Sequence, residues 1–471
     1  MVVTAEEAPG KMTPQLWRVC WVIVFGAFAG MLDTTVVNVG VDTLVRDLGT
    51  GLGAVQWVFT AYLIALAVSL PACGWLTRRY GAGRLWLAAL VAFTVASALC
   101  AFAGNIGWLI ALRVLQGLAA GLMVPAGQTV LGEVAGPARL GRVVSTLGIV
   151  VSLGPAIGPL LGGLILHSLS WPWLFLINIP IGVAGTLLGL RYVPRGERGT
   201  AHRPDGTGYL LIGVGIPAVI YAATAWGETG TFASPRVFLP ALAGIALLVA
   251  FCVRTRGREH PLLDLGLFGN RTFAVAAATT FFTGPAMFGA MFLLPLYFQV
   301  LGGSDVVTTG LLMIGLGAGS AIALPLAGRF TDRYGGGAVA LWGSVATLAA
   351  TVPFAVADLP VDGVFVQALL VLRGMASAFL MMPVGTVAFA AVTRSQLPDG
   401  TAQINIVMRV GGAVGTALFA VVLANALPDG PAMAFRTAFA WLTGCSVAAV
   451  GLTAWLWRVQ RRNRAVAGTM A

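Results

Sequence analysis

Long apolar runs, each about the length that a helix needs to cross a bilayer, follow one another along the whole chain. The chain has 471 residues, of which 58% are hydrophobic and 10% are charged, whereas a soluble domain has about 25% charged residues. In a bilayer, continuous apolar runs of this length fold as helices, because each helix satisfies its own backbone polar groups. The sequence therefore predicts an all-α polytopic membrane protein. Its fourteen expected spans are 19–41, 55–76, 84–104, 107–130, 143–166, 171–191, 208–226, 236–253, 272–300, 307–328, 337–356, 363–392, 405–426 and 433–457.

Basic residues indicate the orientation. Of the 28 Lys and Arg residues, 23 are assigned to the side that holds both termini, three to the opposite side, and two lie within spans. In this count Arg409, at the start of span 405–426, belongs to the loop side. The positive-inside rule then places both termini in the cytoplasm. The net charge of +11 follows from this topology and requires no nucleic-acid partner. The first apolar run is long enough to remain as a membrane helix.

An internal repeat divides the chain. Residues 74–81 and 328–335 both read G-x-[LF]-T-x-R-Y-G, and residues 115–117 and 372–374 form a weaker second pair at nearly the same offset. Such duplication is typical of transporters with two halves around a central site. Two inserted spans between the halves are expected to pack peripherally. The predicted domains are a cytoplasmic N-terminus (1–18), an N-terminal six-helix half (19–192), cytoplasmic linkers with the two inserted helices (193–271), a C-terminal six-helix half (272–457) and a basic cytoplasmic tail (458–471).

Asp33 is the one acidic residue in the middle of a strongly apolar run. It follows Arg18 by fifteen residues, so it lies roughly 22 Å above the cytoplasmic end of the span. A carboxylate at the centre of a membrane helix costs about 2.5–3.5 kcal/mol on insertion scales, and such a residue is usually used. We expect it to couple transport to protons, to recognise a cationic substrate, or both. In the alternative interpretation, Asp33 is only a buried acid satisfied by Thr34, Thr35 or Asn38.

Arg113, in span 107–130, is the expected partner of Asp33. A buried guanidinium needs a counter-charge, and Asp33 is the mid-membrane carboxylate that the sequence offers. Alternatively, Arg113 binds backbone carbonyls and only joins spans 19–41 and 107–130. The role of Arg373, in span 363–392, stays open.

Motifs along the whole chain resemble the major facilitator superfamily, specifically its fourteen-helix drug–proton antiporters. They are residues 32–39 (LDTTVVNV), Gln56 with Trp57 and Tyr62, residues 113–117 (RVLQG), residues 154–163 (GPAIGPLLGG) and residues 171–182 (WPWLFLINIPIG). The resemblance implies a major facilitator fold of two six-helix halves plus two inserted helices. It also implies an antiporter motif, formed by Gly154, Pro155, Gly158, Pro159, Gly162 and Gly163. Its glycines recur at every fourth position, which gives a smooth face for close helix packing.

The repeat segments at 74–81 and 328–335 predict a cytoplasmic gate. Its candidate residues are Gly74, Arg78, Arg79, Gly81, Asp332 and Arg333. The resembled family usually has Asp where this chain has Arg78, and only the second copy keeps the acid, as Asp332. An acid-based clasp in the N-terminal half is therefore in doubt.

Candidate substrate-binding residues combine polar groups near Asp33 with thioethers and aromatic rings, which suit varied lipophilic ligands. They are Asn38, Gln56, Tyr62, Gln116, Met287, Phe288, Met291, Phe379 and Met382.

Missing motifs restrict the energy source. Lys11 is the only lysine and no Gly-rich loop precedes it, so the sequence has no Walker A motif. The cysteines show no metal-ligand spacing. We expect no enzymatic activity, cofactor, metal or nucleotide, and transport driven by an ion gradient, with protons favoured over sodium.

The sequence thus predicts a monomeric, proton-coupled antiporter of the bacterial cytoplasmic membrane that exports small lipophilic or cationic drugs or antibiotics. Two alternatives stay open. One is a proton-coupled exporter or importer dedicated to a single metabolite, because one fold supports many functions. The other is a membrane sensor that does not transport.

Overall fold

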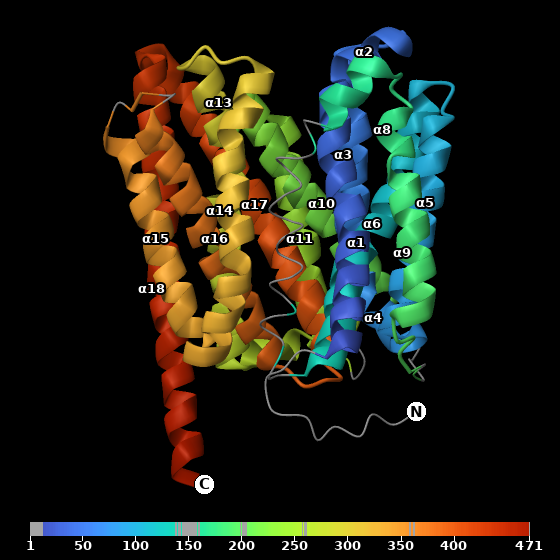
Figure 1. The fold of residues 1–471 in the computed structure, drawn as a ribbon, viewed down its shortest axis with the longest axis vertical. Helices are drawn as coiled ribbons and strands as arrows, with labels where there is room; N and C mark the ends of the chain where they lie inside the picture. The colour runs from blue at the N-terminus through green and yellow to red at the C-terminus, as the bar shows by residue number, and fades with distance from the viewer. Residues whose placement is uncertain are drawn as a thin grey trace.

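The protein is a bundle of long helices that run up and down between two faces (Figure 1). The computed structural model describes residues 13–136, 161–197, 205–256, 261–357 and 363–470, apart from single positions within or between these ranges. Its α-helices are α1 (Pro14–Val36), α2 (Val41–Asp47), α3 (Leu52–Ser69), α4 (Ala72–Tyr80), α5 (Ala82–Ala101), α6 (Ile106–Ala135), α8 (Trp173–Leu176), α9 (Asn178–Tyr192), α10 (Gly206–Thr229), α11 (Pro235–Thr255), α12 (Arg271–Gly284), α13 (Ala290–Val300), α14 (Val306–Tyr334), α15 (Gly336–Val356), α16 (Val364–Ala390), α17 (Leu397–Ala426) and α18 (Pro431–Met470).

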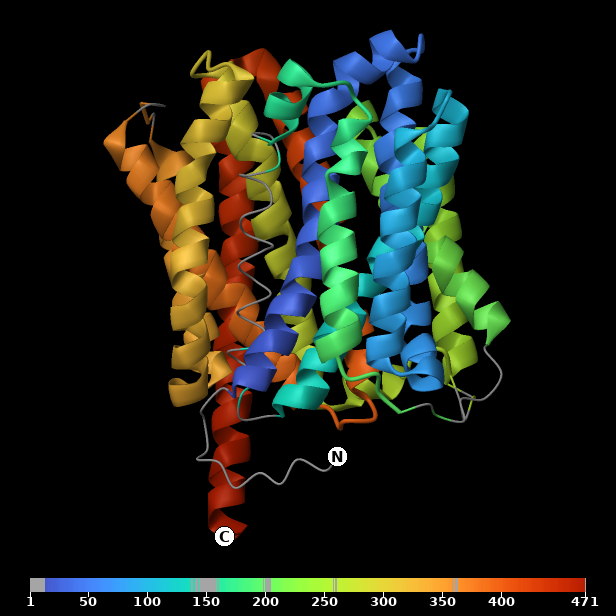
Figure 2. The ribbon, with the colours of Figure 1, turned by 45° about the vertical axis from the view of Figure 1, so that its right-hand side comes forward.

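Helix α1 begins, and α18 ends, on the same face of the bundle, which we call the terminal face; the opposite face is the far face. Helix α18 continues past the rest of the bundle on the terminal face (Figure 2). A chain whose two ends lie on the same face crosses the membrane an even number of times, and this agrees with the fourteen spans that the sequence predicts.

Within the described residues, twelve helical segments are long and apolar enough to cross a membrane. Helices α3 and α4 form one further span, bent by 56° at a short break that contains Pro71, because proline cannot donate the backbone hydrogen bond that a straight helix needs. The predicted span 143–166 lies mostly outside the described residues. The all-α, multi-span prediction is confirmed, and fourteen spans are consistent with these helices.

The predicted span 272–300 is one span, Arg271–Val300. A π-helical turn at Pro285–Gly289 separates α12 from α13 within it. Such turns disturb the regular hydrogen-bond ladder and are frequent at functional sites. The Ala286 carbonyl in this turn accepts a 2.8 Å hydrogen bond from Arg373 of α16. The buried Arg373 therefore links α16 to the π-helical turn.

The two repeat segments have the same local structure. Gly81 follows α4 with φ 88° and ψ 141°, and Gly335 follows α14 with φ 89° and ψ 144°. Both amides donate to a carbonyl four residues earlier, that of Thr77 or Thr331. A side chain would be strained at such positive φ values, so glycine is required at both sites. The repeat is thus present in the local structure as well as in the sequence.

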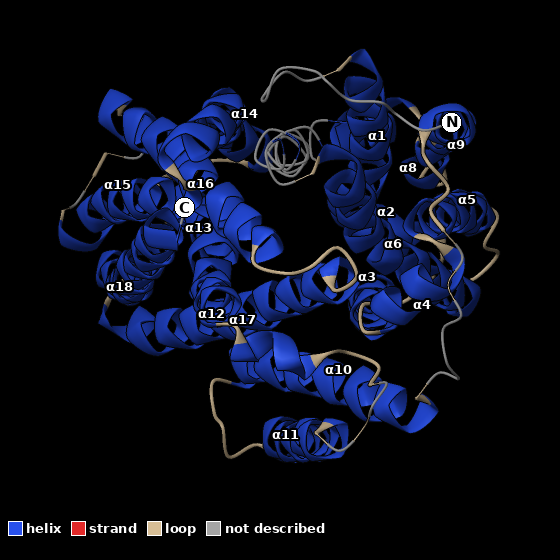
Figure 3. Ribbon diagram, turned by 90° about the horizontal axis from the view of Figure 1, so that it is seen from below, coloured by secondary structure: helices blue, strands red, loops and turns tan. Residues whose placement is uncertain are grey.

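The inserted helices α10 and α11 differ in position. Viewed from the terminal face, α11 lies outermost, on α10 (Figure 3). Helix α10 packs against both α3 and α17, which belong to different halves. Both inserted helices thus lie at one edge of the bundle (Figure 3), and α10 also bridges the two halves. Small residues on α10 permit this close packing: Gly227 lies against Ala417 and Ala420 of α17.

Candidate functional site

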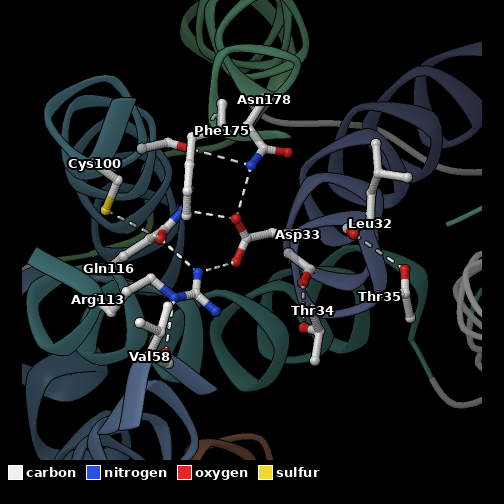
Figure 4. A network of polar contacts seen from close by, with 12 residues as sticks. Leu32, Asp33, Thr34, Thr35, Val58, Cys100, Arg113, Gln116, Phe175 and Asn178 are labelled. Atoms are coloured by element: carbon white, nitrogen blue, oxygen red, sulfur yellow. Dashed lines mark hydrogen bonds and ion pairs between the residues drawn. The ribbon is translucent and has the colours of Figure 1, made fainter. Parts of the chain in front are cut away.

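Asp33 lies in the last turn of α1, fully enclosed by protein. Its carboxylate accepts three hydrogen bonds, from Arg113 of α6 at 2.6 Å, from Gln116 of α6 at 2.9 Å and from Asn178 of α9 at 2.9 Å (Figure 4). The predicted pairing of Asp33 with Arg113 is therefore present in the structure. Three donors, of which Arg113 is also a cation, offset the cost of burying this charge.

Ser97 of α5 completes the group. Its hydroxyl accepts hydrogen bonds from Gln116 and Asn178, each at 3.1 Å, and donates to the Phe175 carbonyl at 3.0 Å. We call Asp33, Ser97, Arg113, Gln116 and Asn178 the Asp33 network. It joins four helices of the N-terminal half. The Oδ1 atom of Asn178 is buried in the network and has no hydrogen-bond partner among the described residues.

Arg113 combines the two roles that the sequence left open. Besides Asp33 and Gln116, its guanidinium donates to the Val58 carbonyl of α3 at 3.2 Å. It also lies 4.0 Å from the centre of the Tyr62 ring, a distance at which a cation and an aromatic face attract each other. Arg113 is only 1% exposed. It therefore pairs with the acid and also holds α3 against α6.

Removing one member of this pair should destabilise the protein more than removing both. In Arg113→Gln, Asp33 stays buried without its cation, and breaking a buried pair costs about 3–5 kcal/mol. We expect a large fall in the thermal unfolding temperature of the purified protein, and a smaller fall for Arg113→Gln combined with Asp33→Asn. The matched control is Arg333→Gln, at the exposed end of α14. Equal falls in the single and double variants would contradict a coupled pair.

The candidate substrate-binding residues do not form one group. Tyr62 and Gln116 belong to or touch the Asp33 network. Gln56 is exposed and donates to Glu228 of α10 at 3.3 Å. The side chain of Asn38 lies outside the described part of the structure.

The predicted Met and Phe surface also divides. Met287 and Phe288 lie in the π-helical turn and Met291 follows in α13, all half-buried. Phe379 and Met382 instead pack in an apolar cluster between α14 and α16. The structure therefore places these two inside the C-terminal half, away from the Asp33 network. Apolar side chains that line a core and those that line a cavity look alike in sequence.

The antiporter motif is described only in part, since Gly154, Pro155 and Pro159 lie outside the described residues. At Gly158, a Cβ atom would collide with the Thr35 side chain of α1. Gly162 is buried and Gly163 is exposed. The close approach at Gly158 agrees with the predicted smooth face.

The two halves meet on the terminal face. Arg78 of α4 forms a 2.5 Å ion pair with Asp399 of α17, and Thr129 and Gln128 of α6 are hydrogen-bonded to Thr401 at 3.1 Å and to Asn405 at 2.7 Å. We call these three pairs the inter-half contact. A Cβ atom on Gly74 would collide with the Asp399 carboxylate, so this predicted gate glycine permits the approach.

The remaining gate candidates lie apart from this contact. Arg79 is exposed, Gly81 ends α4, and Asp332 and Arg333 are exposed at the end of α14. In the inter-half contact the N-terminal half supplies the arginine, Arg78, and the C-terminal half supplies the acid, Asp399. Asp399 escapes prediction because the predicted span 405–426 begins eight residues after the helix does, at Leu397.

A cavity of about 1560 Å³ opens beside the inter-half contact on the terminal face. Charged residues of both signs line it, among them Arg78, Glu133, Asp264, Arg394 and Asp399. The Asp33 network does not line this cavity. The inter-half contact joins α4 and α6 of the N-terminal half to α17 of the C-terminal half beside this cavity.

Arg409 lies well inside a helix, so counting it with the loop side is wrong. Helix α17 begins at Leu397, so Arg409 lies twelve residues, or roughly 18 Å, inside it. Its Nε atom is buried, and no residue in the described part of the chain is hydrogen-bonded to it.

Comparisons with known proteins agree with this architecture. The profile of the Major Facilitator Superfamily matches residues 23–416 and 276–469. The chain belongs to this superfamily. It is therefore a multi-pass membrane protein of a transporter family, whose members carry small molecules rather than catalyse reactions.

Two curated relatives are similar in sequence. A protein of Mycobacterium tuberculosis named multidrug resistance protein B homolog is 35% identical over 409 residues, which cover 86% of this chain and 76% of the relative. A protein of Shigella flexneri named putative multidrug resistance protein MdtD is 32% identical over 321 residues, covering 68% of this chain and 67% of the relative.

Solved structures share the fold at low identity. The human organic anion transporter MFSD10 superposes with a TM-score of 0.68 at 15% identity, covering 94% of this chain and all of that one. The proton:xylose symporter XylE superposes with a TM-score of 0.65 at 15% identity, covering 94% and 95%. At this identity the likeness shows the fold alone.

Proposed function

We propose that the chain is a proton-coupled antiporter that exports small lipophilic molecules across the bacterial cytoplasmic membrane and works as a monomer. The observation that carries the proposal is the enclosed Asp33 network. An intramembrane carboxylate that is paired, hydrogen-bonded and located between helices is typical of proton relays in transporters. The names of the two bacterial relatives support drug export over a dedicated metabolite.

The Asp33 network accommodates a neutral acid as well as a charged one. With Asp33 ionised, its carboxylate accepts from Asn178 and Gln116. With Asp33 protonated, its hydroxyl can donate to the unpartnered Oδ1 atom of Asn178 after a rotation of that amide. Arg113 then loses its counter-charge, which weakens the link between α1 and α6. Protonation thereby changes how strongly these helices are held together.

The difference between the two faces of the bundle supports export as the direction of transport. The excess of arginine on the terminal face supports a cytoplasmic location for that face. The inter-half contact then closes the cytoplasmic side in this state. Export requires the alternate state, in which the halves separate at this contact and admit substrate. A proton that reaches Asp33 from the far face would drive the return.

The carboxylate of Asp33 offers little to a cationic substrate in this state. All three of its hydrogen bonds come from protein donors, and it is fully buried. A cation would have to displace Arg113 from Asp33. Proton coupling is therefore the favoured role of Asp33.

Everted membrane vesicles test the proposal. Respiration acidifies their lumen, so vesicles that contain the protein should accumulate the lipophilic dye Hoechst 33342 and lose protons from the lumen when the dye is added. Nigericin, which collapses the pH difference, should abolish the accumulation, and replacing sodium by choline should not. Vesicles without the protein are the control. Accumulation that follows the sodium gradient, or movement of the dye in the opposite direction, would contradict the proposal.

A further inference from the structure

Three arginines lie deep within the described spans, and they differ in their partners. Arg113 is paired with Asp33. Arg373 donates to the Thr351 hydroxyl and to the Ala286 carbonyl. Within the described chain, the guanidinium of Arg409 forms no hydrogen bond or ion pair, and its Nε atom is buried. An unpaired charge at this depth is costly, so Arg409 calls for a partner that the described residues do not supply.

The position of Arg409 points to the space between the halves. Thr401, Asn405 and Arg409 follow one another at intervals of four on α17, so they share one face of the helix. The first two are hydrogen-bonded to Thr129 and Gln128 of the N-terminal half. Arg409 comes one turn further into the membrane on this same face. It therefore lies directly beyond the inter-half contact, and its side chain is half-buried rather than sealed.

Tyr62 connects this position with the Asp33 network. Tyr62 of α3 is within electrostatic range of Arg409. The guanidinium of Arg113 lies 4.0 Å from the centre of the ring of the same tyrosine. Tyr62 is therefore a neighbour that Arg409 shares with the Asp33 network.

An apolar side chain lies on the next turn of α17. Gly412 follows Arg409 by three residues, so it lies on nearly the same face of the helix, and the ring of Phe288 packs on it. An apolar wall with one convergent charge is the usual composition of a small-molecule site. It matches a ligand with a lipophilic body and a single charged group.

We propose that Arg409 is a substrate-binding residue that anchors an acidic group, such as a carboxylate, of a lipophilic substrate between the two halves. The planar guanidinium matches a carboxylate with two parallel hydrogen bonds. The inference rests on the proposed function, because it assumes that substrate passes between the halves. It adds lipophilic acids and zwitterions to the substrates that the proposed function covers.

Equilibrium binding tests the proposal in the full chain in lipid nanodiscs, without any gradient. The probes are dansylglycine and its amide, which differ only in the carboxylate and become fluorescent in apolar sites. The wild type should bind the acid about tenfold more tightly than the amide, which corresponds to one charge-assisted contact. In Arg409→Gln this ratio should fall to about one while the affinity for the amide is unchanged, and Arg409→Lys should keep part of the preference.

Arg333→Gln, which removes an exposed arginine from the end of α14, is the matched control and should leave the ratio unchanged. Empty nanodiscs give the blank, and each variant should elute as a single peak. A wild type that binds neither probe, or binds both equally, would overturn the proposal, as would an unchanged ratio in Arg409→Gln. Failure of the vesicles to accumulate Hoechst 33342 would remove the proposed function without changing this ratio, so the two failures are distinguishable.

Discussion

Asp33→Asn should abolish proton-driven accumulation and lower the stability of the protein, which should still be folded and inserted. Asparagine has the shape of aspartate but cannot take up a proton, so the cycle loses its titratable group. A pH difference of one unit is worth about 1.4 kcal/mol per proton, which sustains roughly a tenfold substrate gradient. In everted vesicles with this pH difference, we expect the wild type to reach about that ratio and the variant to reach about one.

The variant should still equilibrate substrate down its concentration gradient, because the path between the halves does not need the charge. This separates loss of coupling from loss of the protein. Asp47→Asn is the matched control, since Asp47 is an exposed acid at the end of α2 in the same half. Normal proton-driven accumulation in Asp33→Asn would overturn the role of Asp33.

The pairing of Asp33 with Arg113 could be predicted because charges are rare in these spans. With one carboxylate and few cations, a buried pair follows from the cost of leaving either unpaired. Ser97 and Asn178 escaped prediction for the opposite reason. Single neutral polar residues are common in apolar runs, and only the fold brings α5 and α9 to the carboxylate.

Helix α17 shows how a span boundary affects a site. Its hydropathy places the start near residue 405, which leaves Arg409 in the first turn of the span, where it is counted with the loop side. The structure begins the helix at Leu397, with Pro398 and Asp399 in its first turn. Proline and an acid at these positions are recognised helix-start signals. Amide hydrogens in the first turn have no partner within the helix, so proline loses no hydrogen bond there, and the acid complements the helix dipole. Reading those signals would have brought both Asp399 and Arg409 into the bundle.

The ion pair between Arg78 and Asp399 should hold the two halves together on the terminal face, so reversing one charge should separate them there. In Arg78→Asp, two carboxylates would face each other where Asp399 is nearly buried. A loss of about 1.5–3 kcal/mol is expected for a hydrogen bond between charged groups, and 1.4 kcal/mol changes a population about tenfold. The open state should therefore become at least about ten times more populated.

Chemical labelling measures this opening. Thr401→Cys, in a background without the five native cysteines, introduces a thiol at a buried position of the inter-half contact. A membrane-impermeant maleimide added to everted vesicles should label it slowly in the parent. Labelling should become about tenfold faster with Arg78→Asp or Asp399→Arg, and slow again when both changes are combined, because the pair is then restored with its charges exchanged.

Arg79→Asp provides the matched control for this experiment. It makes the same change of charge one residue further along α4, where the side chain is exposed and outside the inter-half contact. Labelling of the cysteine should stay slow in that variant. If the exchanged pair labels as fast as either single variant, the attraction between residues 78 and 399 does not hold the halves together. Closure would then depend on the Thr129–Thr401 and Gln128–Asn405 hydrogen bonds and on the close packing at Gly74.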